Sequence, residues 1–238
     1  MVRIVPITGV EIRLAAGNWP LPAEMRAAVP GRWQAMLAQN PHLWDGRILG
    51  VTKPVIGDDG IVRAEAREEA YSAFLVWREA GFPEIGIRNM FGSGLIVSSD
   101  GALIYGIMGG TTANAGRVYP PAGTLEPRDI NAEGMVDIQG SIAIELMEET
   151  GLHIDEARRG GMVAVLDEPR ISIAQALHFP ATAEELLSRI RANLDRQEER
   201  ELADVVAVRS AADARAAGDP PPYAAALADA IGSGSLRL

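Results

Sequence analysis

Two apolar runs separated by a turn signal stand near the middle of the chain, in GSGLIVSSDGALIYGIMGG (residues 92–110). The residues between the runs, Ser98-Ser99-Asp100-Gly101, are typical of a tight turn, and the runs are rich in residues that strands favour. This stretch predicts a β-hairpin. A chain that contains it must be built around a sheet.

The other segments predict strands and helices in alternation. We expect further strands at residues 2–14, 47–56, 61–66, 161–168, 170–179 and 203–209, with a short strand entering the Pro/Gly-rich loop at 117–127. We expect helices at residues 22–38 (broken near Pro30), 67–80, 138–150 (ended by Gly151) and 182–196, and a short helix after Pro220-Pro221-Pro222. This mixture predicts an α/β (α+β) fold with a mixed sheet.

The length of 238 residues fits one large domain or two small ones, and 47% hydrophobic residues are enough to bury a core. We expect an N-terminal α+β segment (1–90), a central domain (91–209) and a C-terminal Ala/Pro-rich tail with a short helix (210–238). The N-terminal segment is expected to shape a substrate pocket or a dimer interface.

Charge and composition exclude several functions. The net charge is −10, which argues against nucleic acid as a partner because phosphate backbones attract basic surfaces. The absence of cysteine excludes disulfides, thiol catalysis and cysteine zinc sites, and it fits a reducing compartment. No stretch approaches the roughly 18 apolar residues needed to cross a membrane. We therefore expect a cytoplasmic protein without a membrane partner.

The helix at 138–150 ends in ELMEETG (145–151), which places Glu145, Glu148 and Glu149 within one arc of the helix. The face with Ala143, Leu146 and Met147 is expected to be the core face. The like charges lie three and four residues apart, and two of them occupy the last turn, where the helix dipole disfavours negative charge. Each penalty is a few tenths of a kcal/mol.

Such a cluster has two interpretations. It is a solvated acidic face, or it is a site for a divalent cation, because carboxylate oxygens are the ligands that Mg²⁺ and Mn²⁺ prefer. The neighbouring sequence favours the cation site.

In that context, I144-E-L-M-E-E-T-G-L152 resembles the second half of the signature of the Nudix hydrolases, R-E-U-x-E-E-x-G-U, where U is a bulky aliphatic residue. Gly123 is similar to the opening glycine, and Asp129 follows it after five intervening residues, where the family has glutamate. Fourteen residues separate Asp129 from Ile144 instead of seven, which indicates an insertion. We expect residues 130–140 to form a loop that can be shortened without loss of the fold.

The resemblance covers roughly residues 91–209. It implies a Nudix-like α/β/α sandwich and a metal-dependent pyrophosphohydrolase that cleaves a nucleoside diphosphate linked to another moiety. The Pro-Ala-Gly form of the loop resembles enzymes for nucleotide sugars and ADP-ribose. Carried over, Glu145, Glu148, Glu149 and the Gly123 carbonyl bind Mg²⁺ or Mn²⁺, and Glu145 or Glu149 also activates water. The partner is a small nucleotide substrate, and a homodimer is an open alternative.

The sequence departs from the family at Ile144, which stands where the signature has arginine. Arg117 or Arg128 near the glycine loop is expected to supply that cation and to bind substrate. The alternative is an inactive or slow Nudix-fold module that binds a nucleotide, and a third reading is a structural protein. The four Trp residues are expected in the core, with stacking on a base as the alternative. The segment NLDRQEEREL (193–202) is expected to be exposed.

Overall fold

In the computed structural model, which describes residues 1–238, the strands form one mixed sheet of twelve strands. The strands are β1 (Arg3–Ile7), β2 (Gly9–Leu14), β3 (Arg47–Thr52), β4 (Val55–Ile56), β5 (Ile61–Ala70), β6 (Ile87–Val97), β7 (Leu103–Met108), β8 (Val118–Tyr119), β9 (Ala122–Thr124), β10 (Arg158–Asp167), β11 (Arg170–His178) and β12 (Leu202–Val208). The helices are α1 (Ala23–Gln39), α2 (Tyr71–Glu79), α3 (Ile138–Thr150), α4 (Ala183–Leu194), α5 (Ala211–Ala217) and α6 (Pro222–Gly232), with 3₁₀ turns η1 (Pro127–Asp129) and η2 (Ile154–Glu156). The expected hairpin is present as β6 and β7.

Strand β6 is the centre of the sheet. Along one edge it pairs in parallel with β11, and along the other it pairs antiparallel with β3, then β9, then β7. All of its residues except the last are buried, as expected for a strand covered on both faces. Gly92 and Gly94 lie on the face toward α3, and a Cβ at Gly92 would lie 2.8 Å from the Ile142 side chain. The glycines therefore allow α3 to lie close against the sheet.

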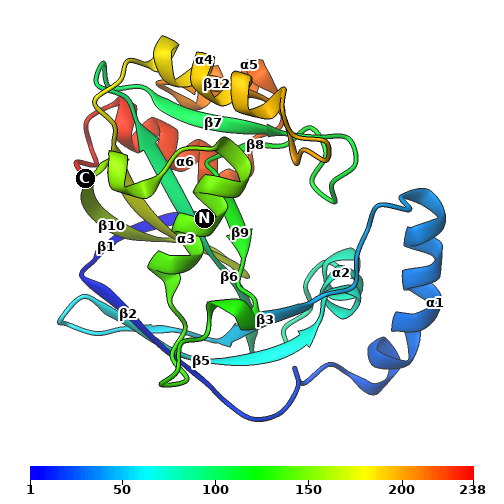
Figure 1. Cartoon of the computed structure of the whole chain (residues 1–238). Coiled ribbons are helices and arrows are strands. Elements are labelled where there is room, and N and C mark those ends of the chain that lie inside the picture. Colours follow the sequence, from blue (N-terminus) through cyan, green and yellow to red (C-terminus); the bar gives the residue numbers. More distant parts are fainter.

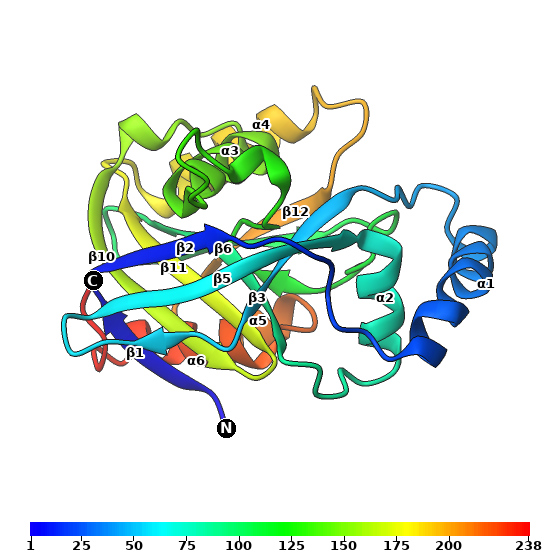
Figure 2. The same cartoon turned by 90° about the horizontal axis from the view of Figure 1, so that it is seen from below.

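Helices cover both faces of the sheet. Figure 2 shows α3 and α4 on one face, with α5 and α6 on the other. The main hydrophobic core joins side chains of β6, α3 and α4 with Ala224 and Leu227 of α6 and with Ile12 of β2. This arrangement confirms the mixed α/β class and the α/β/α layering expected from the sequence. None of the helices combines the length and the apolar character that crossing a membrane requires.

The sheet curls until its two edges nearly meet. Its strand order runs β1-β10-β11-β6-β3-β5-β2, so the first two strands of the chain stand at opposite ends of the order. Only Thr8 separates β1 from β2. The expected single strand over 2–14 is therefore wrong, because the chain passes at Thr8 from one edge of the sheet to the other. Figure 1 shows β1 leading from the N-terminus to a corner, where the chain turns into β2.

Two helices of the N-terminal segment differ from expectation. Residues 67–70 belong to β5, because they pair with β3, and α2 begins only at Tyr71. Strand pairing here prevails over local helix propensity. Helix α1 continues through Pro30, which removes one main-chain hydrogen bond. Met25, Val29 and other side chains of α1 pack against the aromatic cluster of α2, which compensates for that loss. Figures 1 and 2 show α1 at the side of the molecule, beside α2.

The insertion before α3 forms a loop at residues 130–137, and α3 begins at Ile138, so the last part of the expected loop is helical. The loop extends the edge of the sheet beside β2. The Leu14 N–H donates to the Gly134 carbonyl, and the Val136 N–H donates to the Ile12 carbonyl, each at 2.9 Å. The loop is therefore tied to the N-terminal segment by main-chain hydrogen bonds.

Helix α3 has the bounds expected from the sequence, and its two ends explain them. At the N-terminus the Asp137 carboxylate accepts a hydrogen bond from the Gly140 N–H at 2.9 Å. At the C-terminus Gly151 adopts the left-handed conformation with φ of 71°, which glycine tolerates without steric cost. Both signals are local, so the sequence fixes where this helix begins and ends.

Candidate active site

Two of the three clustered glutamates point into the protein. Glu149 is only 4% exposed, and the Glu145 side chain is 12% exposed, whereas the Glu148 side chain is 55% exposed. Leu146 is buried as expected, but Met147 is 40% exposed and does not belong to the core face. The buried stripe of α3 therefore includes two carboxylates. This arrangement does not fit a fully solvated acidic face.

Gly123 makes room for Glu145. Strand β9 pairs with β6 through Gly123 and Gly92, which holds β9 against the centre of the sheet. A Cβ at Gly123 would lie 2.0 Å from the Cδ atom of Glu145. The loop glycine and the first glutamate of the cluster are thus in direct contact, although 21 positions separate them along the chain. Only glycine permits this approach.

Arg128 carries the cation nearest to the cluster. Its guanidinium contacts the carboxylates of Glu145 at 2.9 Å, Glu148 at 3.0 Å and Glu126 at 3.2 Å. The turn η1 positions this side chain, because the Asp129 carboxylate accepts a hydrogen bond from the Glu126 N–H at 2.8 Å. Asp129 is buried and caps the turn, and it does not join the cluster.

Ile144 and Arg117 lie elsewhere. Ile144 is partly buried on α3 and brings no charge to the cluster. The Arg117 guanidinium lies 3.9 Å from the Asp219 carboxylate and contacts none of the three glutamates. Of the two arginines expected near the glycine loop, Arg128 is the one that the fold brings to the carboxylates.

Burial and mutual repulsion dominate the electrostatics of the cluster. Burial raises the pKa of Glu145 to about 7, and Glu148 adds to the rise while Arg128 opposes it. Burial raises the pKa of Glu149 well above its ordinary value, and Glu145 and Glu201 raise it further. The Oε2 atom of Glu149 is buried without a hydrogen-bond partner. Burying a charge without a partner lowers stability, and the Oε2 atom of Glu149 has no partner that would offset this cost.

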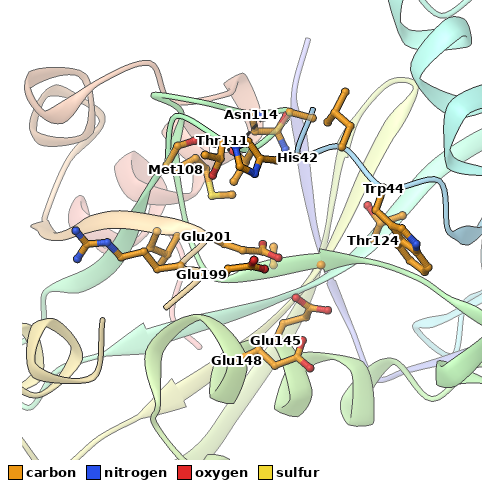
Figure 3. Close-up of a pocket in the computed structure, with 18 of the residues that line it drawn as sticks. His42, Trp44, Met108, Thr111, Asn114, Thr124, Glu145, Glu148, Glu199 and Glu201 are labelled. Carbon is orange, nitrogen blue, oxygen red and sulfur yellow. Dashed lines mark hydrogen bonds between the residues drawn. The ribbon is translucent and has the colours of Figure 1, made fainter. Parts of the chain in front are cut away.

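The sequence patterns did not indicate Glu201 as a candidate site residue. It belongs to the segment expected to be a charged exposed surface, and it lies just before β12. Its side chain is exposed at the wall of a cavity, where the surrounding protein and Glu148 raise its pKa. Figure 3 shows Glu199 and Glu201 across from Glu145 and Glu148. No local pattern marks Glu201, because only the pairing of β12 with β7 brings it to this place.

A cavity of about 960 Å³, which we call the acidic cavity, is lined by Glu145, Glu148 and Glu201 but not by Glu149. Its walls are α3, the segment before β12, the loop after β7 and the N-terminal loop that carries His42 and Trp44. Trp44 is 74% exposed, and its ring lies against the backbone at Gly46, where a Cβ would lie 2.2 Å from it. Trp44 is therefore not a core residue. The N-terminal segment contributes directly to the cavity.

The acidic cavity contains carboxylate oxygens of the kind that bind a divalent cation, but these oxygens do not converge on one point. No group of three His, Asp or Glu side chains stands close enough together to hold a metal ion. Glu145 and Glu148 share the Arg128 guanidinium instead. Oxygen donors, excess negative charge and the unpartnered Glu149 oxygen all fit Mg²⁺ or Mn²⁺. A cation could bind Glu145 and Glu148 together only if the Arg128 guanidinium moved away from them.

No protein-family model and no curated protein sequence matches the chain. Among solved structures, the chain is similar to a MutT protein from Methanosarcina mazei Go1, with 17% identity, a TM-score of 0.41, and coverage of 63% of this chain and 96% of that one. A Nudix hydrolase from Nitrosomonas europaea has 16% identity, a TM-score of 0.40, and coverage of 63% and 91%.

A bifunctional NMN adenylyltransferase/ADP-ribose pyrophosphatase from Francisella tularensis has 14% identity and a TM-score of 0.36, over 60% of this chain and 39% of that one.

Proposed function

We propose that the chain is a Nudix-type hydrolase that cleaves the diphosphate of a nucleoside diphosphate linked to another moiety, of the nucleotide-sugar or ADP-ribose type, with Mg²⁺ or Mn²⁺. The observation that carries the proposal is Glu149. Its buried Oε2 atom has no hydrogen-bond partner, and it lies one helical turn from Glu145, which lines a cavity large enough for such a ligand.

In the reaction, water attacks one phosphorus of the anhydride, the bridging P–O bond breaks, and two phosphate monoesters are released. Glu145, Glu148 and Glu149, with the Gly123 carbonyl, would hold the cation. A bound divalent cation would neutralise phosphate oxygens, stabilise the developing charge and lower the pKa of water. Glu145 or Glu149 accepts the proton of the attacking water and orients it.

Arg128 has two roles in this proposal. Without ligands its guanidinium compensates Glu145 and Glu148, which the residue at position 144 cannot do. When a cation binds these carboxylates, the guanidinium is freed toward the cavity, where it can contact a phosphate oxygen of the substrate. Arg128 thereby serves as the substrate-binding arginine expected from the sequence.

A second candidate is a nucleotide-binding module without turnover. The observations that favour it are Ile144 in place of the family's arginine and the guanidinium of Arg128 among the carboxylates. In such a module Arg128 would stay in place, so nucleotide binding would not depend on a divalent cation.

The test is product release from ADP-ribose, nucleotide sugars and dinucleotides, with Mg²⁺, with Mn²⁺ and with EDTA. The hydrolase proposal expects metal-dependent turnover by the parent and a loss of at least about 100-fold in rate in Glu145→Gln and Glu149→Gln. Glu133→Gln, an exposed change in the loop at 130–137, is the matched control and should keep full activity. Full activity in both Glu145→Gln and Glu149→Gln would refute the proposed site. Nucleotide binding that needs no metal and leads to no turnover would favour the nucleotide-binding module.

A further inference from the structure

A second cavity, of about 650 Å³, adjoins the acidic cavity. The two share a wall that includes Gly123, Thr124 and Tyr119. The second cavity is lined by three arginines, Arg78, Arg117 and Arg170, and we call it the arginine cavity. Six aromatic side chains also line it, and its one carboxylate, Glu79, lies 3.5 Å from the exposed Arg32. The carboxylates of the acidic cavity and the guanidinium groups of the arginine cavity therefore lie on opposite sides of the shared wall.

Arg78 is a partly buried cation that lacks a carboxylate partner. Its guanidinium donates only to neutral acceptors, the Asn114 Oδ1 atom at 3.2 Å and the Ala113 carbonyl at 3.4 Å. It lies 5.9 Å from the centre of the Phe74 ring. Burial lowers the pKa of Arg78, and Arg117 contributes to the lowering. A desolvated cation beside a second cation is unfavourable unless an anion joins them.

Asn89 and Arg170 also present unused polar atoms in this cavity. They are register partners on β6 and β11, so the centre of the sheet fixes both of them. Asn89 is 8% exposed, and its Oδ1 atom is buried without a hydrogen-bond partner. Arg170 donates to the Asp167 carboxylate at 2.9 Å, which leaves its Nε atom buried and unpartnered. Buried polar atoms are normally satisfied, so the unpartnered Arg170 Nε–H, a donor, fits an oxyanion, whereas the Asn89 Oδ1 atom is itself an acceptor and would not contact one.

The third arginine is held only weakly. Arg117 lies 3.9 Å from the Asp219 carboxylate, whose side chain is 75% exposed. Such a surface contact contributes little to stability, so the guanidinium is free to bind elsewhere. Planar guanidinium groups bind oxyanions through paired hydrogen bonds. Arg78 and Arg117, from α2 and from the segment before β8, can therefore act on the same anion.

We propose that the arginine cavity binds an oxyanion, a phosphate or a carboxylate, carried by the moiety that the diphosphate links to the nucleoside. This inference rests on the proposed function and narrows its substrate class to derivatives with a second anionic group. The shared wall allows one ligand to reach both cavities, with the diphosphate beside Glu145 and the oxyanion beside Arg78. In a chain of net charge −10, the arginines also offset the repulsion of such a ligand.

The direct test uses inorganic phosphate alone with metal-free protein, followed by calorimetry and by thermal melting at constant ionic strength. Phosphate should bind and raise Tm, and Arg78→Gln and Arg117→Gln should each weaken binding by at least about tenfold, as expected for the loss of a charge-assisted hydrogen bond. Arg215→Gln, an exposed change on α5, is the matched control and should bind phosphate like the parent. Acetate in place of phosphate tells which oxyanion the cavity prefers.

This test is independent of hydrolysis. Glu149→Gln should keep phosphate binding even though it loses turnover, so failure of one proposal leaves the other standing. With full substrates, a derivative whose linked moiety carries a phosphate or carboxylate should exceed its neutral counterpart in kcat/KM, and Arg117→Gln should remove that preference. Absence of phosphate and acetate binding, or equal binding by both arginine variants and the parent, overturns the proposal. Arg117 is 39% exposed at its side chain, so its variant is expected to fold.

Discussion

Replacing Glu149 with Gln removes one ionisable carboxyl group from the interior of the protein and leaves the size of the side chain nearly unchanged. Burial, together with Glu145 and Glu201, raises the pKa of the native carboxyl. A carboxyl whose pKa is higher in the folded state loses stability as pH rises from its unfolded pKa to its folded pKa. The Gln variant has no such loss. We therefore expect it to be more stable than the parent, by an amount that grows with pH.

The free energy of protonating Glu149 sets the upper limit of this gain in stability. If the folded parent keeps Glu149 protonated at pH 8, it holds a proton that the unfolded chain, with a pKa of about 4.3, has released. Each pH unit above that value costs about 1.4 kcal/mol, so the limit is about 5 kcal/mol at pH 8 and about 1 kcal/mol at pH 5. An ionised Glu149 cannot exceed this limit, because protonation would then be more favourable. We expect the gain at pH 8 to stay within this limit and to exceed the gain at pH 5.

The assay is urea unfolding at pH 5 and pH 8 in EDTA, followed by the fluorescence of the buried Trp19 and Trp77. Glu148→Gln makes the same change in charge on the same helix, but at a side chain that is 55% exposed. It should change the free energy of unfolding by less than about 1 kcal/mol at either pH. Added Mn²⁺ should stabilise the parent and narrow its difference from Glu149→Gln, because binding to the native state stabilises it.

One result would refute this reasoning. If Glu149→Gln is no more stable than the parent at pH 8, or if the difference does not grow between pH 5 and pH 8, the buried carboxylate is already compensated. The absence of a partner for its Oε2 atom would then not indicate a missing cation, and the main support for the hydrolase proposal would fall.

Three further predictions concern the neighbouring residues. Gly123→Ala should lower activity much more than Tm, because its Cβ would lie 2.0 Å from the flexible end of the Glu145 side chain and would displace it. Gly110→Ala is the control: Gly110 lines the same cavity, a Cβ there would have no atom within 4 Å, and neither activity nor Tm should change. Arg128→Gln should bind Mn²⁺ more tightly than the parent in calorimetry, because the change removes the guanidinium that competes with Mn²⁺ for the carboxylates of Glu145 and Glu148. Weaker binding would contradict this competition. Deleting residues 131–135 should lower the free energy of unfolding by about 1 to 3 kcal/mol in urea, because two main-chain hydrogen bonds to β2 are lost, and no change would show that the loop is dispensable.

The features of α3 that could be predicted from the sequence are local. Asp137 and Gly151 act on the backbone within a few residues, so the bounds of the helix follow from them. The direction in which the helix faces is not local. Hydrophobic patterning assigned Met147 to the core and Glu149 to the surface, but Gly92 allows the helix to approach the sheet in an orientation that buries Glu149.

The grouping of residues around the candidate site depends on the topology of the sheet. Arg128 could be named in advance because it lies close in sequence to the glycine loop, and the turn η1 brings it to Glu145. Glu201 could not, because its position follows from the pairing of β12 with β7. The break at Thr8 was missed for a similar reason. Residues 2–14 have an uninterrupted strand pattern, and only the curling of the whole sheet divides them.

The two cavities show one principle with opposite signs. A folded protein normally pairs the charges that it buries, because an uncompensated charge in a desolvated place lowers stability. Here the Glu149 carboxyl, one helical turn from Glu145 of the acidic cavity, and the Arg78 guanidinium of the arginine cavity are both left without an oppositely charged partner. They do not pair with each other, although such a pair would relieve both costs. Their separation is most simply explained by a ligand that brings a cation to one side and an oxyanion to the other.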